Sequence, residues 1–305
     1  MSDWPSISYS EWSATCDTLH GHTQVLGKLA AELAPPEPQL QHAALRLTAR
    51  GWETLPLPAP DGSGAFVVAL DLYQHEARVE TSDGEVQAVP LVRDRAVGEV
   101  TRGLLAAVAE VAGEAKIDPA PQEVSWSVAL DQDTEHAAYD RQAVSEYFRM
   151  ATRAAQVLAA FRAPFRGRST PVNAWWGSFD LAVSLFSGDP ATPPSEDFIM
   201  RNAMDSQEVA VGWWTGDPKH DGAAFYGYAH PAQPGFSEAD LGVPGARWDG
   251  DLGEYVLEWS DVVAAADPFG LAVAFCRSVF AHACSTCGWD ADLAASVKGT
   301  PPPVA

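Results

Sequence analysis

Chemically versatile side chains are densest between Phe165 and Gly188. An aspartate beside aromatic rings in a partly dry site can act as a base or hold a cationic ligand. The polar and aromatic members of this group are Asn173, Trp175, Trp176, Ser178 and Asp180. In the alternative interpretation, the tryptophans are core residues and the aspartate accepts a buried hydrogen bond from the backbone. We predict a pocket lined by these five residues, with Asp180 as a catalytic candidate.

The same run reads as a strand with a weak point in it. Alternate residues of a strand share a face, so Trp176 and Asp180 would lie on one side, and Asn173 and Trp175 on the other. A glycine lets the backbone bend, so Gly177 could break this register.

A row of polar residues follows one face of the first predicted helix. His20, Gln24 and Lys28 are spaced i, i+4 and i+8, which places them one above the other. We predict that they line the pocket, with His20 as a second catalytic candidate. A solvated helix face is the alternative. Gly27 on the same helix indicates close packing against a neighbour.

A histidine lies between two aspartates shortly before a second long helix. The spacing is Asp133-x-x-His136-x-x-x-Asp140. A carboxylate that orients an imidazole makes an acid–base pair, so His136 is the third catalytic candidate. The alternative is a network that caps the helix, with Asp140 as its N-cap.

Three further residues are expected to line the pocket from other elements. Glu208 begins an apolar strand and would add a second carboxylate if it faced Asp180. Tyr226 belongs to an aromatic group that suits a flat, cationic or sugar-like ligand, and suits a core equally well. Arg50 is the third.

The cysteines predict neither a disulfide scaffold nor a metal site. Cys284 and Cys287 form a lone C-x-x-C, whereas a structural zinc site usually needs a second ligand pair. We therefore predict no bound metal, and the cofactor stays unknown. The motifs of nucleotide-binding loops, α/β hydrolases and common zinc peptidases are absent.

Charge and hydropathy argue against several partners. The formal net charge is −22, from 41 acidic and 19 basic residues. Such a surface repels phosphate backbones and anionic lipid, so neither nucleic acid nor a membrane is expected as a partner. The N-terminus lacks the basic and apolar regions of a signal peptide. We expect a cytoplasmic protein, as a monomer or homodimer, with a small molecule as its partner.

The predicted elements repeat their order once. A helix at 11–33, a bent strand, further strands and a helix at 97–112 are followed by a helix at 141–165, more strands and a helix at 267–284. Because the order is not βαβ, we predict an α+β fold, with antiparallel sheets that carry helices on one face.

This order divides the chain into two pseudo-repeated halves that we expect to face each other. The first half would span residues 1–116 and the second 141–297. Residues 117–140 would form an irregular connector between them, and residues 298–305 a disordered tail.

The motifs resemble those of a bacterial family of unknown function whose members are similar in length to this chain. The central one is P-V-x-x-x-W-G-S-F-D-L-A at residues 171–182, and matching stretches begin at residues 18, 48, 133, 208 and 224. Family members commonly carry histidine at the positions of Asn173 and Gln207. Since Asn and Gln are poor metal ligands beside imidazole, the resemblance implies that a role of those histidines is lost or altered here.

These observations predict a small-molecule-binding protein or enzyme with an aromatic, Asp-containing pocket between two similar halves. The alternative is a non-catalytic interaction or scaffold protein whose aromatic residues are core or interface. The sequence assigns no reaction.

Overall fold

The computed structural model describes residues 4–297, so the tail predicted at 298–305 lies outside the described residues. Its contacts divide into two compact units. The N-terminal unit comprises Tyr9–Phe148 and Asn173–Asp180. Of the described residues, the C-terminal unit comprises 4–8, 149–172 and 181–297. The sequence predicts continuous halves; in the structure the N-terminal unit also includes the later segment 173–180, and the C-terminal unit also includes residues before Tyr9.

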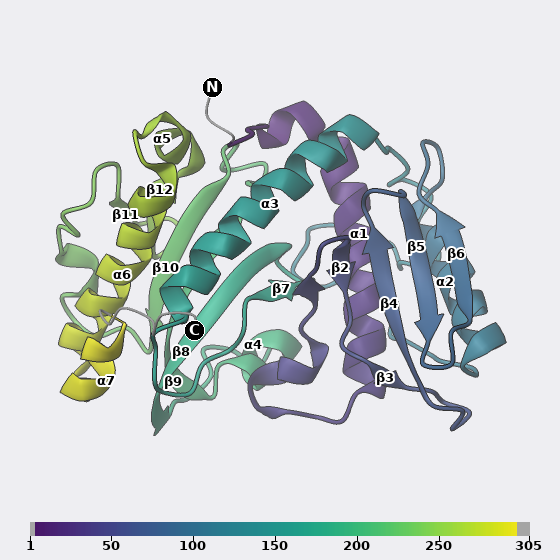
Figure 1. The fold of residues 1–305 in the computed structure, drawn as a ribbon, viewed down its shortest axis with the longest axis horizontal. Helices are drawn as coiled ribbons and strands as arrows, with labels where there is room; N and C mark the ends of the chain where they lie inside the picture. The colour runs from purple at the N-terminus through teal and green to yellow at the C-terminus, as the bar shows by residue number, and fades with distance from the viewer. Residues whose placement is uncertain (1–3, 298–305) are drawn as a thin grey trace, which may run out of the picture. The chain divides into compact units, whose positions relative to one another are not determined.

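The N-terminal unit is an antiparallel sheet that carries two helices (Figure 1). α1 (Tyr9–Leu33) and α2 (Val97–Val111) contact each other, and both contact the sheet. The strand order is β1-β2-β4-β5-β6, with β3 paired to β4. The strands are β1 (Arg46–Leu47), β2 (Gly51–Glu53), β3 (Leu57–Pro58), β4 (Ala65–Asp71), β5 (Glu76–Thr81) and β6 (Val86–Pro90).

The alternation of β5 shows how this sheet is oriented. Ala77 and Val79 are buried, whereas Arg78 and Glu80 on the other face are partly exposed and form an ion pair. A two-faced strand of this kind is typical of an antiparallel sheet with helices on one side. The remaining regular segments of the unit are η1 (Pro38–Ala43) and β7 (Asn173–Trp175).

The C-terminal unit has its own antiparallel sheet, in which β11, β12, β10, β9 and β8 follow one another. α6 (Pro268–Cys287) contacts β9, β10 and β12, and its Phe280 packs edge-to-face on Phe161 of α3 (Arg141–Arg162). The other elements are β8 (Asp180–Pro190), α4 (Phe198–Ala203), β9 (Ser206–Trp214), β10 (Ala224–His230), η2 (Phe236–Glu238), β11 (Arg247–Asp249), β12 (Glu254–Glu258), α5 (Trp259–Ala264) and α7 (Ala291–Ser296).

The α+β class with antiparallel sheets is confirmed. The relation of the two halves by a pseudo-repeat stays a prediction.

Among residues 4–297, one helix has the length and apolar composition of a membrane span, and it is α6. Phe275, Cys276 and Phe280 of this helix are buried against its unit, as in the core helix of a globular fold.

Candidate functional site

The central motif forms a strand, a turn and a second strand. β7 ends at Trp175, residues 176–179 form a turn, and β8 begins at Asp180. Phe179 in the turn has a φ of 56°, a left-handed conformation that bulky residues rarely adopt. The register therefore breaks over the whole turn rather than at Gly177 alone. Ser178 is exposed, and its Oγ donates a hydrogen bond of 2.5 Å to Oδ1 of the buried Asp180.

Trp176 lies in the core of the N-terminal unit. Its indole packs flat against α1 at Gly27, where an added Cβ would come within 2.0 Å of the ring. The indole Nε1 donates a hydrogen bond to the Ala43 carbonyl oxygen at 3.1 Å. Only 1% of the surface of Trp176 is exposed. A residue so enclosed supports the structure of the site and offers no free surface to a ligand. Trp175 next to it is half-buried.

Asn173 also makes structural contacts. Its Oδ1 accepts from Arg46 Nη1 at 2.5 Å, and its Nδ2 donates to Gln41 Oε1 at 3.0 Å. The residue is buried. Both ends of the amide are therefore occupied, in line with the weak case for a metal-binding role at this position.

Phe179 stacks on three aromatic side chains at once. Its ring centroid lies 5.0 Å from that of His20, 5.1 Å from Trp52 and 5.2 Å from Tyr147. Trp52 Nε1 donates to the Tyr147 hydroxyl at 3.2 Å, and burial raises the pKa of that phenol well above its ordinary value. The left-handed conformation of Phe179 is thus held by packing on all sides.

His20 is a buried, neutral imidazole. Its Nε2 lies 2.9 Å from both the Trp176 and the Gly177 carbonyl oxygens, so Nε2 carries the proton and donates it to them. Burial lowers the His20 pKa to about 4, against the opposing effect of these two hydrogen bonds. Nδ1 is therefore the nitrogen with a free lone pair. The amide Nε2 of Gln24 lies 3.3 Å from Nε2 of His20. Because both nitrogens are donors, the two side chains are in contact without a hydrogen bond between them.

The polar row on α1 lies beneath the connector rather than in solvent. Trp126 contacts His20, the backbone of Gln122 contacts Gln24, and the carboxylate of Asp118 acts electrostatically on Lys28. Gln24 donates from Nε2 to the Gln122 carbonyl at 2.9 Å and accepts from the Gln122 N–H at 2.9 Å. The side chain of Gln24 thus holds the connector as a neighbouring peptide group would.

His136 and Asp133 form an oriented pair. Nδ1 of His136 lies 2.6 Å from Oδ2 of Asp133, whose side chain is fully buried. Oδ1 of Asp133 accepts from the backbone N–H groups of Glu135 and His136, which fixes the carboxylate in place. Asp140 instead caps α3, accepting from the N–H groups of Gln142 and Ala143 as the sequence predicts.

Trp126 and His22 join this cluster and were not among the site residues predicted from the sequence. The Trp126 ring lies 4.4 Å from that of His136 and 5.5 Å from that of His20. His22 is buried with Nδ1 unpartnered, and burial lowers its pKa to about 3, although the nearby Asp133 opposes the change. The short apolar stretch around Trp126 in the connector was the available signal. For His22 the available signal was the His20-Gly21-His22 pair.

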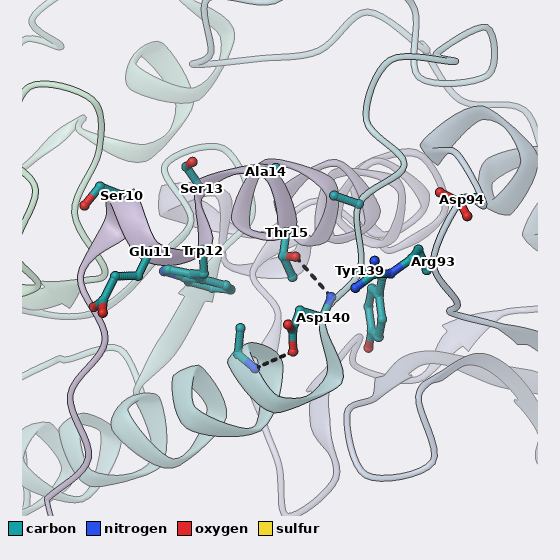
Figure 2. A pocket seen from close by; sticks show the side chains of 12 residues that line it. Ser10, Glu11, Trp12, Ser13, Ala14, Thr15, Arg93, Asp94, Tyr139 and Asp140 are labelled. Carbon is teal, nitrogen blue, oxygen red and sulfur yellow. Dashed lines mark hydrogen bonds between the residues drawn. The ribbon is translucent and has the colours of Figure 1, made fainter.

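A pocket of about 450 Å³ lies at the start of α1 (Figure 2). Its lining includes Trp12 and Ser13 of α1, Tyr139 and Asp140 before α3, and the loop residue Arg93. Figure 2 shows the Thr15 side chain facing Asp140, whose N–H donates to the Thr15 hydroxyl at 3.1 Å. The volume is within the range of small-molecule sites.

The pocket and the histidine cluster follow one another along α1. Ser13 lines the pocket, Asp17 comes one turn later, and His20 lies on the same face a further turn on. Burial raises the pKa of Asp17, opposed by the hydrogen bond from Tyr9 and by the charge of His136. Asp17 therefore lies one turn from the pocket residue Ser13 and interacts electrostatically with His136 of the Asp133–His136 pair.

The remaining predicted residues occupy other surroundings. Arg50 forms ion pairs with Glu53 and Glu80 beside the N-terminal sheet. Glu208 and Tyr226 belong to the C-terminal unit. Burial raises the pKa of Glu208 to about 7 despite a hydrogen bond from Ser184, and the Tyr226 ring lies across Gly212.

In the part of the chain from 4 to 297, no three His, Cys, Asp or Glu side chains converge in a way that could hold a metal ion. The cysteines Cys16, Cys276, Cys284 and Cys287 are free thiols.

Comparison with known proteins identifies a family but no activity. Neither the curated proteins nor the solved structures contain a match to the chain. One family model, described as a family of unknown function (DUF5996), matches residues 4–296. Since that match covers nearly the whole sequence, the chain belongs to the family of unknown function DUF5996.

Proposed function

We propose that the protein binds a small molecule and transfers a proton to or from it, with His136 as the acid–base group. The observation that carries this proposal is the 2.6 Å contact between His136 Nδ1 and the fully buried Asp133 carboxylate. A carboxylate so placed orders the imidazole before any ligand arrives.

Asp133 decides which nitrogen of His136 is basic. Because its Oδ2 accepts the Nδ1 proton, Nε2 holds the free lone pair. The His136 side chain is 17% exposed, so part of it is open to solvent, and the proposal requires a ligand to approach Nε2. Asp133 is a positioning residue in this scheme, since it acts through His136.

His20 and Trp126 support the site in a different way. His20, with a pKa of about 4, stays neutral near pH 7 and can accept a hydrogen bond at Nδ1, but it does not supply a proton. Trp126 contacts both imidazole rings. The pocket at the start of α1, whose lining includes Thr15 and Ala138, gives a small molecule room to bind.

The test uses full-length protein and a defined library of small carbonyl and amine metabolites. Native mass spectrometry identifies library members that bind at 1:1, and those are then incubated in D₂O with the protein. We expect wild type to introduce deuterium at an exchangeable carbon, and His136→Gln to bind the same compound with at least about 100-fold slower exchange. His230→Gln in the C-terminal unit is the matched control. Equal exchange by His136→Gln, or no 1:1 complex at all, would reject the proposal.

A scaffold function is the second candidate, and one observation favours it. Trp176 and Phe179, the most conspicuous aromatic residues of the central motif, are buried in the N-terminal unit. A protein without chemistry needs such residues only for packing. In that case the Asp133–His136 pair only caps the connector, and His136→Gln changes stability without changing any exchange reaction.

A further inference from the structure

The pocket at the start of α1 carries charges of both signs that are not paired with one another. Arg93 lines it together with Asp94 and Asp140 (Figure 2). Among residues 4–297, the Arg93 guanidinium has no carboxylate within 4.0 Å and makes no hydrogen bond. The chain has 41 acidic and only 19 basic residues, so an arginine that stays unpaired beside two carboxylates is available to an anionic group of a ligand.

The loop that carries Arg93 is fixed to the wall of the pocket. The backbone N–H of Asp94 donates to the Ala137 carbonyl oxygen at 2.9 Å. Asp94 has a φ of 66°, a left-handed conformation that aspartate adopts more readily than most residues. Figure 2 shows the Arg93 side chain directed toward Tyr139. The backbone at Arg93 is thus in place before a ligand binds.

Asp140 is fixed more firmly and keeps one carboxylate oxygen available. Its Oδ1 accepts from the N–H groups of Gln142 and Ala143, and its own N–H donates to the Thr15 hydroxyl. Its Oδ2 makes no hydrogen bond within the described range 4–297. A carboxylate oxygen held in this way is suited to bind an ammonium group.

Trp12 adds a hydrogen-bond donor that lacks an acceptor. The residue lines the pocket, is 3% exposed, and stacks on Tyr147 with ring centroids 5.0 Å apart. Its Nε1 is buried and has no hydrogen-bond partner among the described residues. Figure 2 shows the nitrogen-bearing edge of the ring turned toward Glu11, which also lines the pocket. Because a buried donor without a partner is costly, this end favours a ligand that brings an acceptor.

These groups distinguish between classes of ligand. An anion is repelled by the carboxylates of the lining, and a cation without an acid group places a like charge near Arg93. A zwitterion supplies a partner for both signs. At the Trp12 end a carboxamide is suitable, because its oxygen accepts from the indole and its NH₂ donates to the Glu11 carboxylate. A second carboxylate at that end would be repelled by Glu11.

We infer that this pocket binds a free amino acid with a side-chain carboxamide. The α-carboxylate pairs with Arg93, the α-ammonium with Oδ2 of Asp140, and the carboxamide oxygen accepts from Trp12 Nε1. The volume of about 450 Å³ accommodates a molecule of this size. The inference rests on the proposed function only in taking this pocket as the ligand site, since binding requires no proton transfer.

The test compares ligands that differ by one group, by isothermal titration calorimetry on the full-length protein at pH 7. The probes are L-glutamine, glutaramate without the ammonium, 4-aminobutanamide without the carboxylate, and L-glutamate without the amide. We expect L-glutamine to bind at least about 10-fold more tightly than each of the other three, because each has lost a hydrogen-bonded or charged partner. The inference is overturned if neither L-glutamine nor L-asparagine binds, or if glutaramate or 4-aminobutanamide binds as tightly as L-glutamine.

Two variants assign the contacts to residues. Arg93→Gln should weaken L-glutamine about 10-fold and leave the affinity for 4-aminobutanamide unchanged. Arg95→Gln is the matched control, since Arg95 lies in the same loop, donates to the Pro90 carbonyl and does not line the pocket. Asp140→Asn still caps α3 and should weaken L-glutamine to the affinity of glutaramate. Wild-type affinity for L-glutamine in Arg93→Gln would also overturn the inference.

Failure of this inference is distinguishable from failure of the proposed function. His136→Gln should bind L-glutamine as wild type does, because His136 does not line the pocket. If L-glutamine binds as expected but His136→Gln exchanges its deuterium as fast as wild type, only the proton-transfer function is wrong. If L-glutamine does not bind while His136 is required for exchange into another compound, only the ligand class is wrong.

Discussion

At the scale of single residues, Gly27 is among the glycines with the least room for a side chain. A methyl group there would meet Cγ and Cδ1 of Trp176 at 2.0 Å and Cδ2 at 2.3 Å. Alanine improves helix propensity by about 1 kcal/mol, but overpacking a buried ring costs about 3 kcal/mol when the ring cannot move. We expect Gly27→Ala to lower the free energy of unfolding by about 2 kcal/mol, measured by urea denaturation.

Gly21 on the same helix is the matched control for that substitution. Its nearest neighbour is the end of the Val97 side chain at 2.8 Å, which can rotate away. Gly21→Ala should therefore change stability much less. If Gly27→Ala proved as stable as wild type, the indole would not lie where the structure places it.

The Asp133–His136 pair makes a second prediction at this scale. Asparagine at position 133 can still accept the two backbone hydrogen bonds through its oxygen, but its NH₂ group faces His136 Nδ1. We expect Asp133→Asn to move the imidazole proton from Nδ1 to Nε2, which ¹⁵N NMR of the imidazole detects directly. Proton transfer should fall about 100-fold or more because Nε2 then carries the proton and cannot accept one from the ligand. An unchanged tautomer in the variant would contradict this account.

At the scale of elements, the connector is held to α1 by a side chain that imitates a peptide. Gln24→Ala removes both hydrogen bonds to Gln122 and leaves its N–H and C=O without their partners. Each lost bond costs about 1 kcal/mol. We expect faster amide hydrogen exchange across residues 117–130, with little change in the sheet strands. Glu32→Ala, on an exposed position of the same helix, should leave the connector's exchange rate as in wild type.

Sequence patterns predicted the elements whose signals are local. α1 follows the helix predicted at 11–33, and α2 follows the one predicted at 97–112. The turn at 176–179 was foreseen only as a weak point, because Phe179 adopts its left-handed conformation through packing against residues far away in sequence. Local pattern carries no information about such contacts.

In the candidate site too, contacts between residues close in sequence could be predicted, whereas those that depend on tertiary packing could not. The Asp133–His136 pair is close in sequence, so its spacing alone indicated the contact that the structure shows. The burial of the α1 row could not be predicted, because it depends on where the irregular connector lies. The sequence equally suited a solvated face for His20, Gln24 and Lys28.

At the scale of the whole molecule, the buried histidines make stability depend on pH. His20 and His22 have pKa values lowered to about 4 and about 3, against 6.5 for an ordinary histidine. Between pH 6.5 and 4 the unfolded chain binds more protons than the folded one. The contribution of these histidines to the free energy of unfolding is therefore fully present above pH 6.5 and is lost as the pH falls. At pH 5 the loss is about 2 kcal/mol for each histidine, at about 1.4 kcal/mol per pKa unit.

Urea denaturation at pH 7 and pH 5 measures this loss. His22→Leu removes one of the two groups, so the difference between the two pH values should shrink by about 2 kcal/mol relative to wild type. The half-exposed His230, replaced by Gln, should leave the difference unchanged. A pH dependence that is the same in wild type and His22→Leu would show that His22 is not held neutral in the fold.

The place of Asn173–Asp180 in the N-terminal unit has a consequence for biosynthesis. A nascent chain that has reached Phe148 already contains α1 and the whole sheet of that unit, but it lacks the indole that fills the space at Gly27. Until Trp176 leaves the ribosome, α1 exposes an apolar slot and its unit remains incomplete. The last segment of the N-terminal unit ends at Asp180, so in a chain of 305 residues this unit can complete its packing only past the midpoint of synthesis.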